Sequence, residues 1–144
     1  MSEIADFMAR DHGRCDELLV AAEQAVAVAD WKRVNREVEQ FTEALRHHMA
    51  MEEEVLFPAV EAATGQTQGP TRVMRLEHEQ MRQLLGPLQH AAGQRDESEY
   101  LAVSDTLLLL MQQHNVKEES ILYPMADRIL SASGSTILNR MQGL

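Results

Sequence analysis

The sequence has few of the residues on which many fold and function classes depend. Its 144 residues include one cysteine, seven glycines, four prolines and 4% aromatic residues. A single cysteine, Cys15, cannot form an internal disulfide, which favours a reducing cytoplasm as the location. Scarce glycine and proline, together with abundant Ala, Leu, Met, Glu, Gln and Arg, favour an all-helical fold.

Basic residues are also scarce. Thirteen Lys and Arg residues stand against 23 Asp and Glu residues, giving a formal net charge of −10 at pH 7. Phosphate binding needs a basic surface, so we expect no nucleic-acid partner and no adsorption to anionic membranes. No apolar run approaches the roughly 18 residues that suggest a membrane span, and the acidic start of the chain is unlike a signal peptide.

Four long helices are indicated by the periodic segments that separate the glycines and prolines. Residues that cap helices mark three of the starts, namely Ser2, Asp30 and the pair Asp96 and Glu99, which has the spacing of a capping box. Pro70 suits the first turn of the third helix. The expected helices span about residues 2–28, 30–63, 70–92 and 96–130.

Two features modify these helices. Pro58 and Pro124 fall inside the second and fourth helices and are expected to kink or end them. The tail from Ser131 holds a weakly amphipathic piece, broken by glycine, that suits a short fifth helix. We therefore expect residues 1–130 to form one helical domain, and residues 131–144 to form a C-terminal tail with a short helix packed on that domain.

The two halves of the sequence are related by an offset of 66 residues, which superimposes His12 on His78 and His48 on His114. The segment HMAMEEEVLFP, which begins at His48, then meets HNVKEESILYP, with five of eleven positions identical. Rare residue types that recur at one offset indicate an internal repeat. Each half is expected to be a helical hairpin, and two hairpins make an antiparallel up-and-down four-helix bundle.

Each expected helix carries a histidine in the middle of its apolar face, and two helices add a glutamate one turn later. The predicted buried stripes are Ala5, Met8, His12, Cys15, Leu19, Ala22 and Val26; Val34, Val38, Phe41, Leu45, His48, Glu52, Val55 and Ala59; Thr71, Met74, His78, Met81, Leu85, Leu88 and Ala92; and Tyr100, Ser104, Leu107, Met111, His114, Glu118, Ile121 and Met125.

The buried glutamates need a compensating positive charge. A carboxylate in an apolar interior costs several kcal/mol unless it is paired or bound to a metal. No Lys or Arg lies on the four stripes, so a metal cation is the expected partner. His and Glu at positions i and i+4 lie about 6 Å apart on one helix face and can reach one metal centre. The predicted metal ligands are His12, His48, Glu52, His78, His114 and Glu118.

Other polar residues near the stripes have simpler explanations. A lone histidine on an apolar face is commonly a hydrogen-bonded core residue, but four matched histidines with two buried glutamates disfavour a purely structural account. Glu53 and Glu119 lie one residue off the stripes and are expected to support the ligands or face solvent, although either can replace its neighbour as ligand. His47 and His90 have no counterpart at the 66-residue offset and are expected on the surface. The pocket wall is expected to include Met8, Met74, Met81 and Cys15, the last as an inert thiol.

Six imidazole and carboxylate ligands suit two metal ions better than one. A tetrahedral zinc takes four ligands, whereas two ions can each take two imidazoles and share Glu52 and Glu118 as bridges. Iron, zinc, copper and manganese all accept such ligands. Two redox metals with an open position in an apolar pocket can meet O2, NO or peroxide. The sequence shows no Ser-His-Asp set, phosphate loop or nucleotide fingerprint that would indicate another chemistry.

The pattern His, His-x3-Glu, His, His-x3-Glu, in which each glutamate is followed by Leu, an aromatic residue and Pro, resembles the hemerythrin family, in particular its HHE cation-binding branch. The resemblance covers about residues 1–130. It implies a four-helix bundle that holds two iron ions joined by an oxo or hydroxo bridge. It further implies His12, His48, His78 and His114 as terminal ligands and Glu52 and Glu118 as bridging carboxylates.

The sequence departs from the oxygen-carrying hemerythrins at one ligand. Those proteins use a fifth histidine one turn from the third-helix ligand, where this chain has Met74 and Arg82. This departure argues against simple reversible O2 carriage. The set of four His and two Glu is closer to the branch linked with iron–sulfur cluster repair and nitric oxide responses, although that branch typically has a cysteine-bearing N-terminal domain. Ferritin-like di-iron proteins share the architecture, but their Glu-x-x-His signature is absent from this sequence.

The leading hypothesis is a non-haem di-iron protein that binds O2, NO or peroxide for sensing, buffering or scavenging. One alternative is a di-iron enzyme that turns over peroxide or NO. Two others are an iron donor for iron–sulfur cluster repair and a metal-free interaction bundle. Monomer and dimer both stay open, as does the metal that a given preparation carries.

Overall fold

The computed structural model describes residues 3–144, and within that range it is almost entirely helical and contains no β-strand. The prediction of an all-helical fold is confirmed, whereas the predicted cap at Ser2 lies outside the described residues. The elements are α1 (Glu3–Ala27), α2 (Trp31–Met51), the π-helix η1 (Glu52–Leu56), α3 (Phe57–Thr64), α4 (Pro70–Gly93), α5 (Glu97–Lys117), the π-helix η2 (Glu118–Leu122), α6 (Tyr123–Ile129), the 3-10 helix η3 (Ser131–Ser133) and α7 (Gly134–Gln142).

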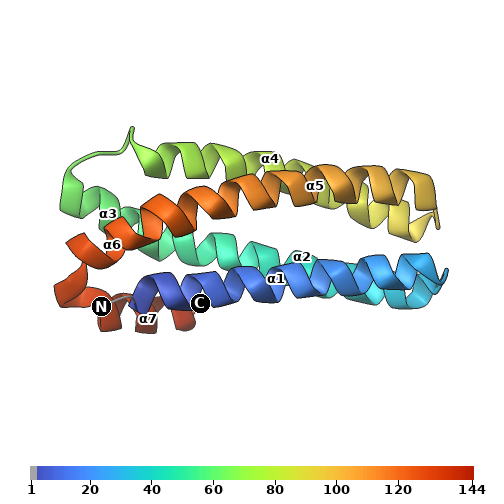
Figure 1. Ribbon diagram of the computed structural model, residues 1–144, viewed down its shortest axis with the longest axis horizontal. Coiled ribbons are helices and arrows are strands. Elements are labelled where there is room, and N and C mark those ends of the chain that lie inside the picture. The colour runs from blue at the N-terminus through green and yellow to red at the C-terminus, as the bar shows by residue number, and fades with distance from the viewer. Residues whose placement is uncertain (1–2) are drawn as a thin grey trace.

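Long helical segments lie side by side along the molecule (Figure 1). They are α1, then α2 continued by η1 and α3, then α4, and finally α5 continued by η2 and α6. Contacts join α1 to α2, α4 to α5, α2 to α4, and α1 to α6. The two short turns lie at one end, and α7 lies toward the other, where it packs on α1 and η1. Within the described range, no helix is long and apolar enough to span a membrane.

The short turn between α1 and α2 and the one between α4 and α5 both end in an aspartate that caps the next helix. Asp30 accepts a hydrogen bond from the backbone N–H of Arg33 at 3.2 Å, and Asp96 accepts one from that of Glu99 at 3.1 Å. Each contact satisfies a free N–H group at a helix start, so both predicted caps are confirmed. The box at Asp96 is one-sided, because its own N–H donates to the Ala91 carbonyl at 3.0 Å.

Of the two effects expected of the prolines, a kink or an end of the helix, the structure contradicts the end. Neither Pro58 nor Pro124 stops the helical path; instead a π-helical segment comes before each of them. In both segments the N–H of the residue before the proline donates to a carbonyl five residues earlier, that of Glu52 or Glu118. A proline cannot donate to the carbonyl four residues back and its ring clashes with that carbonyl, and a wider preceding turn relieves this conflict.

The π segments change which residues face the interior. Regular α-helical spacing predicted Ile121 and Ala59 to be buried, but Ile121 is 60% exposed and Ala59 is only partly buried. Leu122, the residue after Ile121, is 1% exposed. Both predictions are wrong. The wider turn that begins at each glutamate holds one more residue than an α-helical turn and brings Leu56 or Leu122 inward, while the equivalent of Ile121 in η1, Val55, stays buried at 4%. Ala5 and Met125 are also only partly buried, and all other stripe residues are buried as predicted.

The apolar core consists of two clusters. The first includes Leu19, Phe41, Leu85 and Leu107, and the second includes Ile4, Phe57, Val60 and Ile137. On three of the long segments a predicted ligand histidine separates the residues of the two clusters along the chain; on α2 and η1 the boundary lies between Met49 and Met51, flanked by His48 and Glu52. The polar residues therefore form a layer between two dry regions.

The register after η2 can be tested with two neighbouring substitutions. Replacing Leu122 by Ala should lower the free energy of unfolding by about 2–5 kcal/mol, because it leaves a cavity in the second cluster. Replacing the exposed Ile121 by Ala should change it by less than about 0.5 kcal/mol. Urea unfolding followed by circular dichroism measures both. The opposite ranking would mean that the segment is a regular α-helix.

Candidate metal centre

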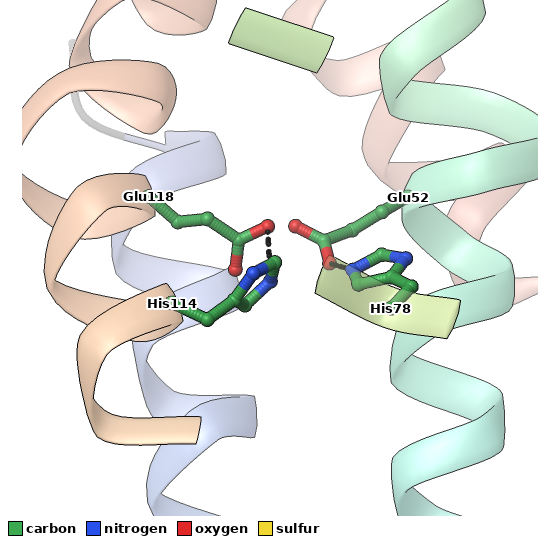
Figure 2. Close-up of side chains that lie close together, drawn as sticks. All are labelled: Glu52, His78, His114 and Glu118. Carbon is green, nitrogen blue, oxygen red and sulfur yellow. Dashed lines mark hydrogen bonds and ion pairs between the residues drawn. The ribbon is translucent and has the colours of Figure 1, made fainter. Parts of the chain in front are cut away.

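All six predicted ligand residues lie in one buried layer, and none is more than 4% exposed. The four histidines come from different helices, and the two glutamates each open a π segment. Figure 2 shows Glu52 and Glu118 facing each other, with His78 and His114 beside them. The residues by element are His12 on α1, His48 on α2, His78 on α4, His114 on α5, Glu52 in η1 and Glu118 in η2.

The candidate ligand atoms form two groups that share one residue. Within each group the atoms lie within 4.8 Å of one another. Glu118 belongs to both groups, which places it between two potential cation positions. One group is Glu52, His78, His114 and Glu118, and the other is His12, His48 and Glu118.

Each imidazole points its Nε2 atom at one of the central glutamates. Nε2 of His12 lies 2.9 Å from Glu118 Oε1, and Nε2 of His114 lies 3.1 Å from Glu118 Oε2. Glu52 Oε1 lies 3.1 Å from His78 Nε2 and 3.5 Å from His48 Nε2. The four Nε2 atoms therefore converge on the two carboxylates.

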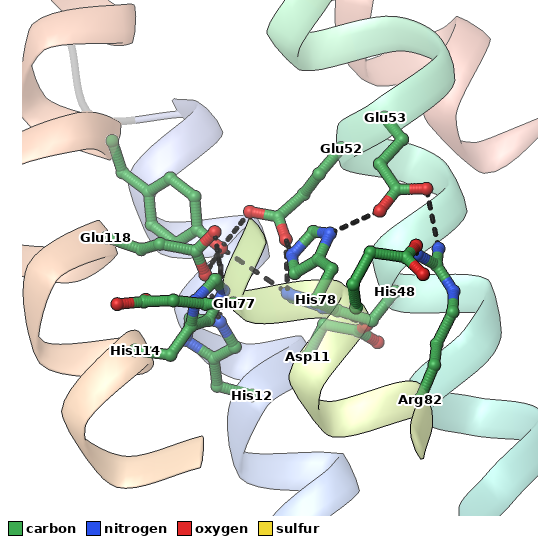
Figure 3. Close-up of polar contacts among 12 residues, drawn as sticks. Asp11, His12, His48, Glu52, Glu53, Glu77, His78, Arg82, His114 and Glu118 are labelled. Carbon is green, nitrogen blue, oxygen red and sulfur yellow. Dashed lines mark hydrogen bonds and ion pairs between the residues drawn. The ribbon is translucent and has the colours of Figure 1, made fainter. Parts of the chain in front are cut away.

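The other ring nitrogen of each of these four histidines donates to a carboxylate outside the layer. Figure 3 labels Asp11, Glu53 and Glu77 among these carboxylates. Because a carboxylate only accepts, the hydrogen is fixed on Nδ1, and the Nε2 lone pair can face a cation. The Nδ1 atoms bond to Asp11 from His48 at 2.7 Å, to Glu53 from His78 at 2.6 Å, to Glu77 from His114 at 2.9 Å, and to Glu119 from His12 at 2.7 Å. We call Asp11, Glu53, Glu77 and Glu119 the outer carboxylates.

The sequence analysis identified only half of the outer carboxylates. Glu53 and Glu119 were expected to support the ligands or face solvent, and both contact an Nδ1 atom on the side away from the central glutamates. Asp11 and Glu77 were missed. They are related by the same 66-residue offset and each precedes a predicted ligand histidine, which is the signal that could have revealed them.

Tyr123 is a further residue of the site, noted in the sequence only as part of the repeat. Its hydroxyl oxygen lies 2.8 Å from Glu52 Oε2 and 2.8 Å from Glu118 Oε1. It also lies 3.1 Å from His12 Nε2 and 3.4 Å from His48 Nε2. Burial, followed by the two nearby carboxylates, raises the pKa of Tyr123 well above its usual value.

The polar layer has the residue pattern of a known cation-binding domain. The family model described as the hemerythrin HHE cation binding domain matches residues 3–126, which is most of the chain. The chain belongs to this family. The searches of curated proteins and of solved structures found no match. The matched range ends within α6, so α7 lies outside it.

Two positions distinguish this hemerythrin domain from one with a fifth histidine. Met74 is buried in the second apolar cluster, 3% exposed, and offers no nitrogen. Arg82 points outward and donates to Glu53 at 2.5 Å, and Lys117 and Arg14 contact Glu77 and Asp11 in the same manner. The basic side chains thus neutralise outer carboxylates and take no part in the central layer.

Ionisation within the hemerythrin site is set by burial and by close charges. Burial and the charge of Glu118 raise the pKa of Glu52 to about 7. Burial also disfavours the Glu118 carboxylate, but its contacts with Glu52, His114 and His12 outweigh this and hold its pKa well below the usual value. Burial would lower the pKa of His12 and His78, yet their glutamate partners raise both to about 9. A bound cation therefore has to replace protons at the Nε2 atoms.

Two buried atoms test whether this residue set fits a metal ion. His114 Nε2 and Glu118 Oε2 make no hydrogen bond, although they lie only 3.1 Å apart. Buried polar atoms are nearly always satisfied, and an imidazole nitrogen facing a carboxylate oxygen is a usual pair of metal ligands. The hemerythrin domain therefore has the donor types, the fixed tautomers and the unsatisfied atoms that a cation requires.

A small enclosed cavity adjoins the histidines on the side of the first apolar cluster. Its volume of about 10 Å³ is close to the space of one water-sized sphere. Cys15 and Met81 line it as predicted, whereas Met8 and Met74 belong to the second cluster, across the polar layer. The other lining residues are His12, Leu45, His48, Met49, His78, Met111, His114 and Asn115.

The thiol of Cys15 should be unreactive in the folded protein. Burial, followed by the charge of Asp11, raises its pKa from 9.0 to about 12. At pH 8 this lowers the thiolate fraction by about a thousandfold, and only the thiolate attacks a disulfide reagent. An aromatic disulfide reagent should therefore react at least about 100-fold more slowly with native protein than with protein in guanidinium chloride.

A matched control for the thiol measurement is Cys15→Ala combined with Val28→Cys, which moves the thiol to a position that is 69% exposed. This variant should react at similar rates in the folded and unfolded states. Rapid modification of native Cys15 would show that the cavity opens to reagents.

Proposed function

We propose that this hemerythrin domain is an up-and-down four-helix bundle with a di-iron centre that binds a small ligand: O2, NO or peroxide. Its role would be sensing, buffering or scavenging of that ligand. The supporting observation is the pair of ligand groups that share Glu118 inside an apolar interior. Two buried carboxylates and four oriented imidazoles are difficult to explain in any other way, since their burial is costly without a cation.

The side chains divide naturally between two ions. His12 and His48 would hold one ion, and His78 and His114 would hold the other. Glu118 would bridge the two ions, because its oxygens face His12 and His114 separately. Glu52 would bridge as well, and the support is that its Oε1 lies 3.1 Å from His78 Nε2 and 3.5 Å from His48 Nε2.

The surrounding residues set the conditions of the site. The outer carboxylates hold the imidazoles in the tautomer that a metal needs and raise their basicity. Leu45, Met49, Met81 and Met111 exclude bulk water and leave room only for a very small molecule. Imidazole and carboxylate ligands suit iron, the metal that the hemerythrin resemblance implies. Two iron ions would supply redox chemistry and an open position for the ligand.

The proposal is tested by measuring iron per chain together with the visible spectrum of reduced protein before and after exposure to air. We expect about two iron ions per chain and near-ultraviolet absorption that appears in air and disappears on reduction. A reversible change would indicate ligand binding, and an irreversible one would indicate sensing or turnover. Absence of iron and of any such absorption after anaerobic reconstitution would refute the di-iron centre.

Substitutions at the glutamates test the ligand assignment. Replacing Glu52 or Glu118 by Ala should abolish loading of the second iron, because each removes a carboxylate that both ions need. Replacing His47, which is partly buried outside the layer, or the exposed His90 should leave two iron ions per chain. Iron analysis of purified variants measures this. Equal iron content in the two classes of variant would contradict the assignment.

Substitutions at the missed outer carboxylates should weaken binding without removing a ligand. Asp11→Ala or Glu77→Ala deprives an imidazole Nδ1–H of its acceptor. We expect a 10- to 100-fold loss of iron affinity, which is the usual effect of removing such a partner. Competition with a chelator measures it. The control is the exposed Glu39→Ala, which removes the same charge from α2 and should leave affinity unchanged.

A further inference from the structure

The two halves of the proposed centre are unequal in their ligands. The group around His78 and His114 has four members, because Glu52 and Glu118 both belong to it. The group around His12 and His48 has three members, since it includes Glu118 alone of the two glutamates. The ion at His12 and His48 would thus have the weaker carboxylate set, because Glu52 approaches this group only through the 3.5 Å contact of its Oε1 with His48 Nε2.

The hydroxyl of Tyr123 lies where a fourth donor is lacking. Its oxygen is within 3.4 Å of one atom from each member of the smaller group, namely His12 Nε2, His48 Nε2 and Glu118 Oε1. It also lies 2.8 Å from Glu52 Oε2, the oxygen of Glu52 that contacts no histidine. This position explains why Glu52 contributes only one oxygen to the histidines.

The position of the Tyr123 ring is fixed by packing. The residue is fully buried and opens α6 directly after η2, five residues after Glu118. Its ring stacks on His12, with centroids 5.5 Å apart and an angle of 29° between the planes. The phenol oxygen therefore cannot leave the ligand layer without disturbing the core.

The residue that is equivalent to Tyr123 in the first half of the sequence has no side-chain oxygen. Phe57 is related to Tyr123 by the 66-residue offset, and its ring stacks on His78 with centroids 5.6 Å apart and an angle of 24°. The aromatic packing is thus the same in both halves, and packing does not require the hydroxyl. Of these two aromatic residues, only Tyr123 has a side-chain oxygen, and its ring lies against the ligand group of His12 and His48, which has fewer carboxylates.

We propose that Tyr123 is a metal ligand, whose phenolate oxygen completes the set formed by His12, His48 and Glu118. This inference rests on the proposed di-iron centre. A phenol has one hydrogen and two lone pairs, so it cannot donate to Glu52 and Glu118 at once, whereas a cation can satisfy all the converging atoms. On ligation the O–H bond breaks, an O–iron bond forms, and the proton passes to the buffer, as expected for protonated groups that bind metals. Tyrosinate is an established protein ligand of iron.

Ligation by tyrosinate has a spectroscopic signature that imidazole and carboxylate ligands lack. The full chain should be loaded anaerobically with Fe²⁺, oxidised, and examined by visible absorption and resonance Raman spectroscopy. We expect a phenolate-to-iron(III) charge-transfer band in the visible region and ring modes of tyrosinate that are enhanced on excitation into it. Ring-deuterated tyrosine should shift these modes.

The variant Tyr123→Phe should lose the band and the ring modes from the iron that it binds, because it lacks the phenolate oxygen. The matched control is Tyr100→Phe, since Tyr100 is the other tyrosine of the chain and is buried in the first apolar cluster. This control should leave the spectrum unchanged.

Two failures can be distinguished. Wild-type protein that holds iron but shows no tyrosinate modes would overturn the assignment of Tyr123 and leave the di-iron proposal standing; this outcome does not depend on how well the variant folds. A band that survives in Tyr123→Phe would overturn it as well. Protein that takes up no iron would refute the proposed centre and this inference together.

Discussion

The structure depends on two carboxylates that are held in a dry interior. Glu52 and Glu118 are both 0% exposed and lie between two apolar clusters, where unpaired charge costs several kcal/mol. Their surroundings are therefore polar in successive shells. Imidazoles surround the glutamates, the outer carboxylates hold the imidazoles, and Arg82 and Lys117 contact two of those carboxylates at the surface. Charge alternates outward from a centre that suits a cation.

The same shells hold the helices together. Each outer carboxylate bonds to a histidine on a neighbouring segment, so that the contacts link α1 with α2, η1 with α4, α4 with α5, and η2 with α1. The contacts form a closed ring around the central glutamates. Displacement of one helix would therefore distort several imidazoles together, and the candidate metal centre and the packing of the helices depend on each other.

The π segments connect this ring to the apolar core. Each begins at a central glutamate and ends just before an aromatic residue and a proline. The wider turn lets the glutamate face inward and also brings Phe57 or Tyr123 back over a histidine. In η2 this turn buries Leu122 and leaves Ile121 exposed, whereas in η1 the equivalent residues Val55 and Leu56 are both buried. The helical irregularity is thus part of how the site is built, as is common for π-bulges.

The sequence by itself determined the helical class, the helix ends and the six residues of the central layer. Helical periodicity and a repeat of rare residue types are local properties of a chain, so they can be followed without coordinates. The tertiary structure alone decided the pairing of Asp11 and Glu77 with histidines on adjacent helices, because a contact between helices depends on their relative rotation. It also decided the burial of Leu122 in place of Ile121, since one added residue in a turn changes every later position. The place of the Tyr123 hydroxyl follows from both: the sequence supplied one tyrosine opposite one phenylalanine, and only packing brought its oxygen between the two carboxylates.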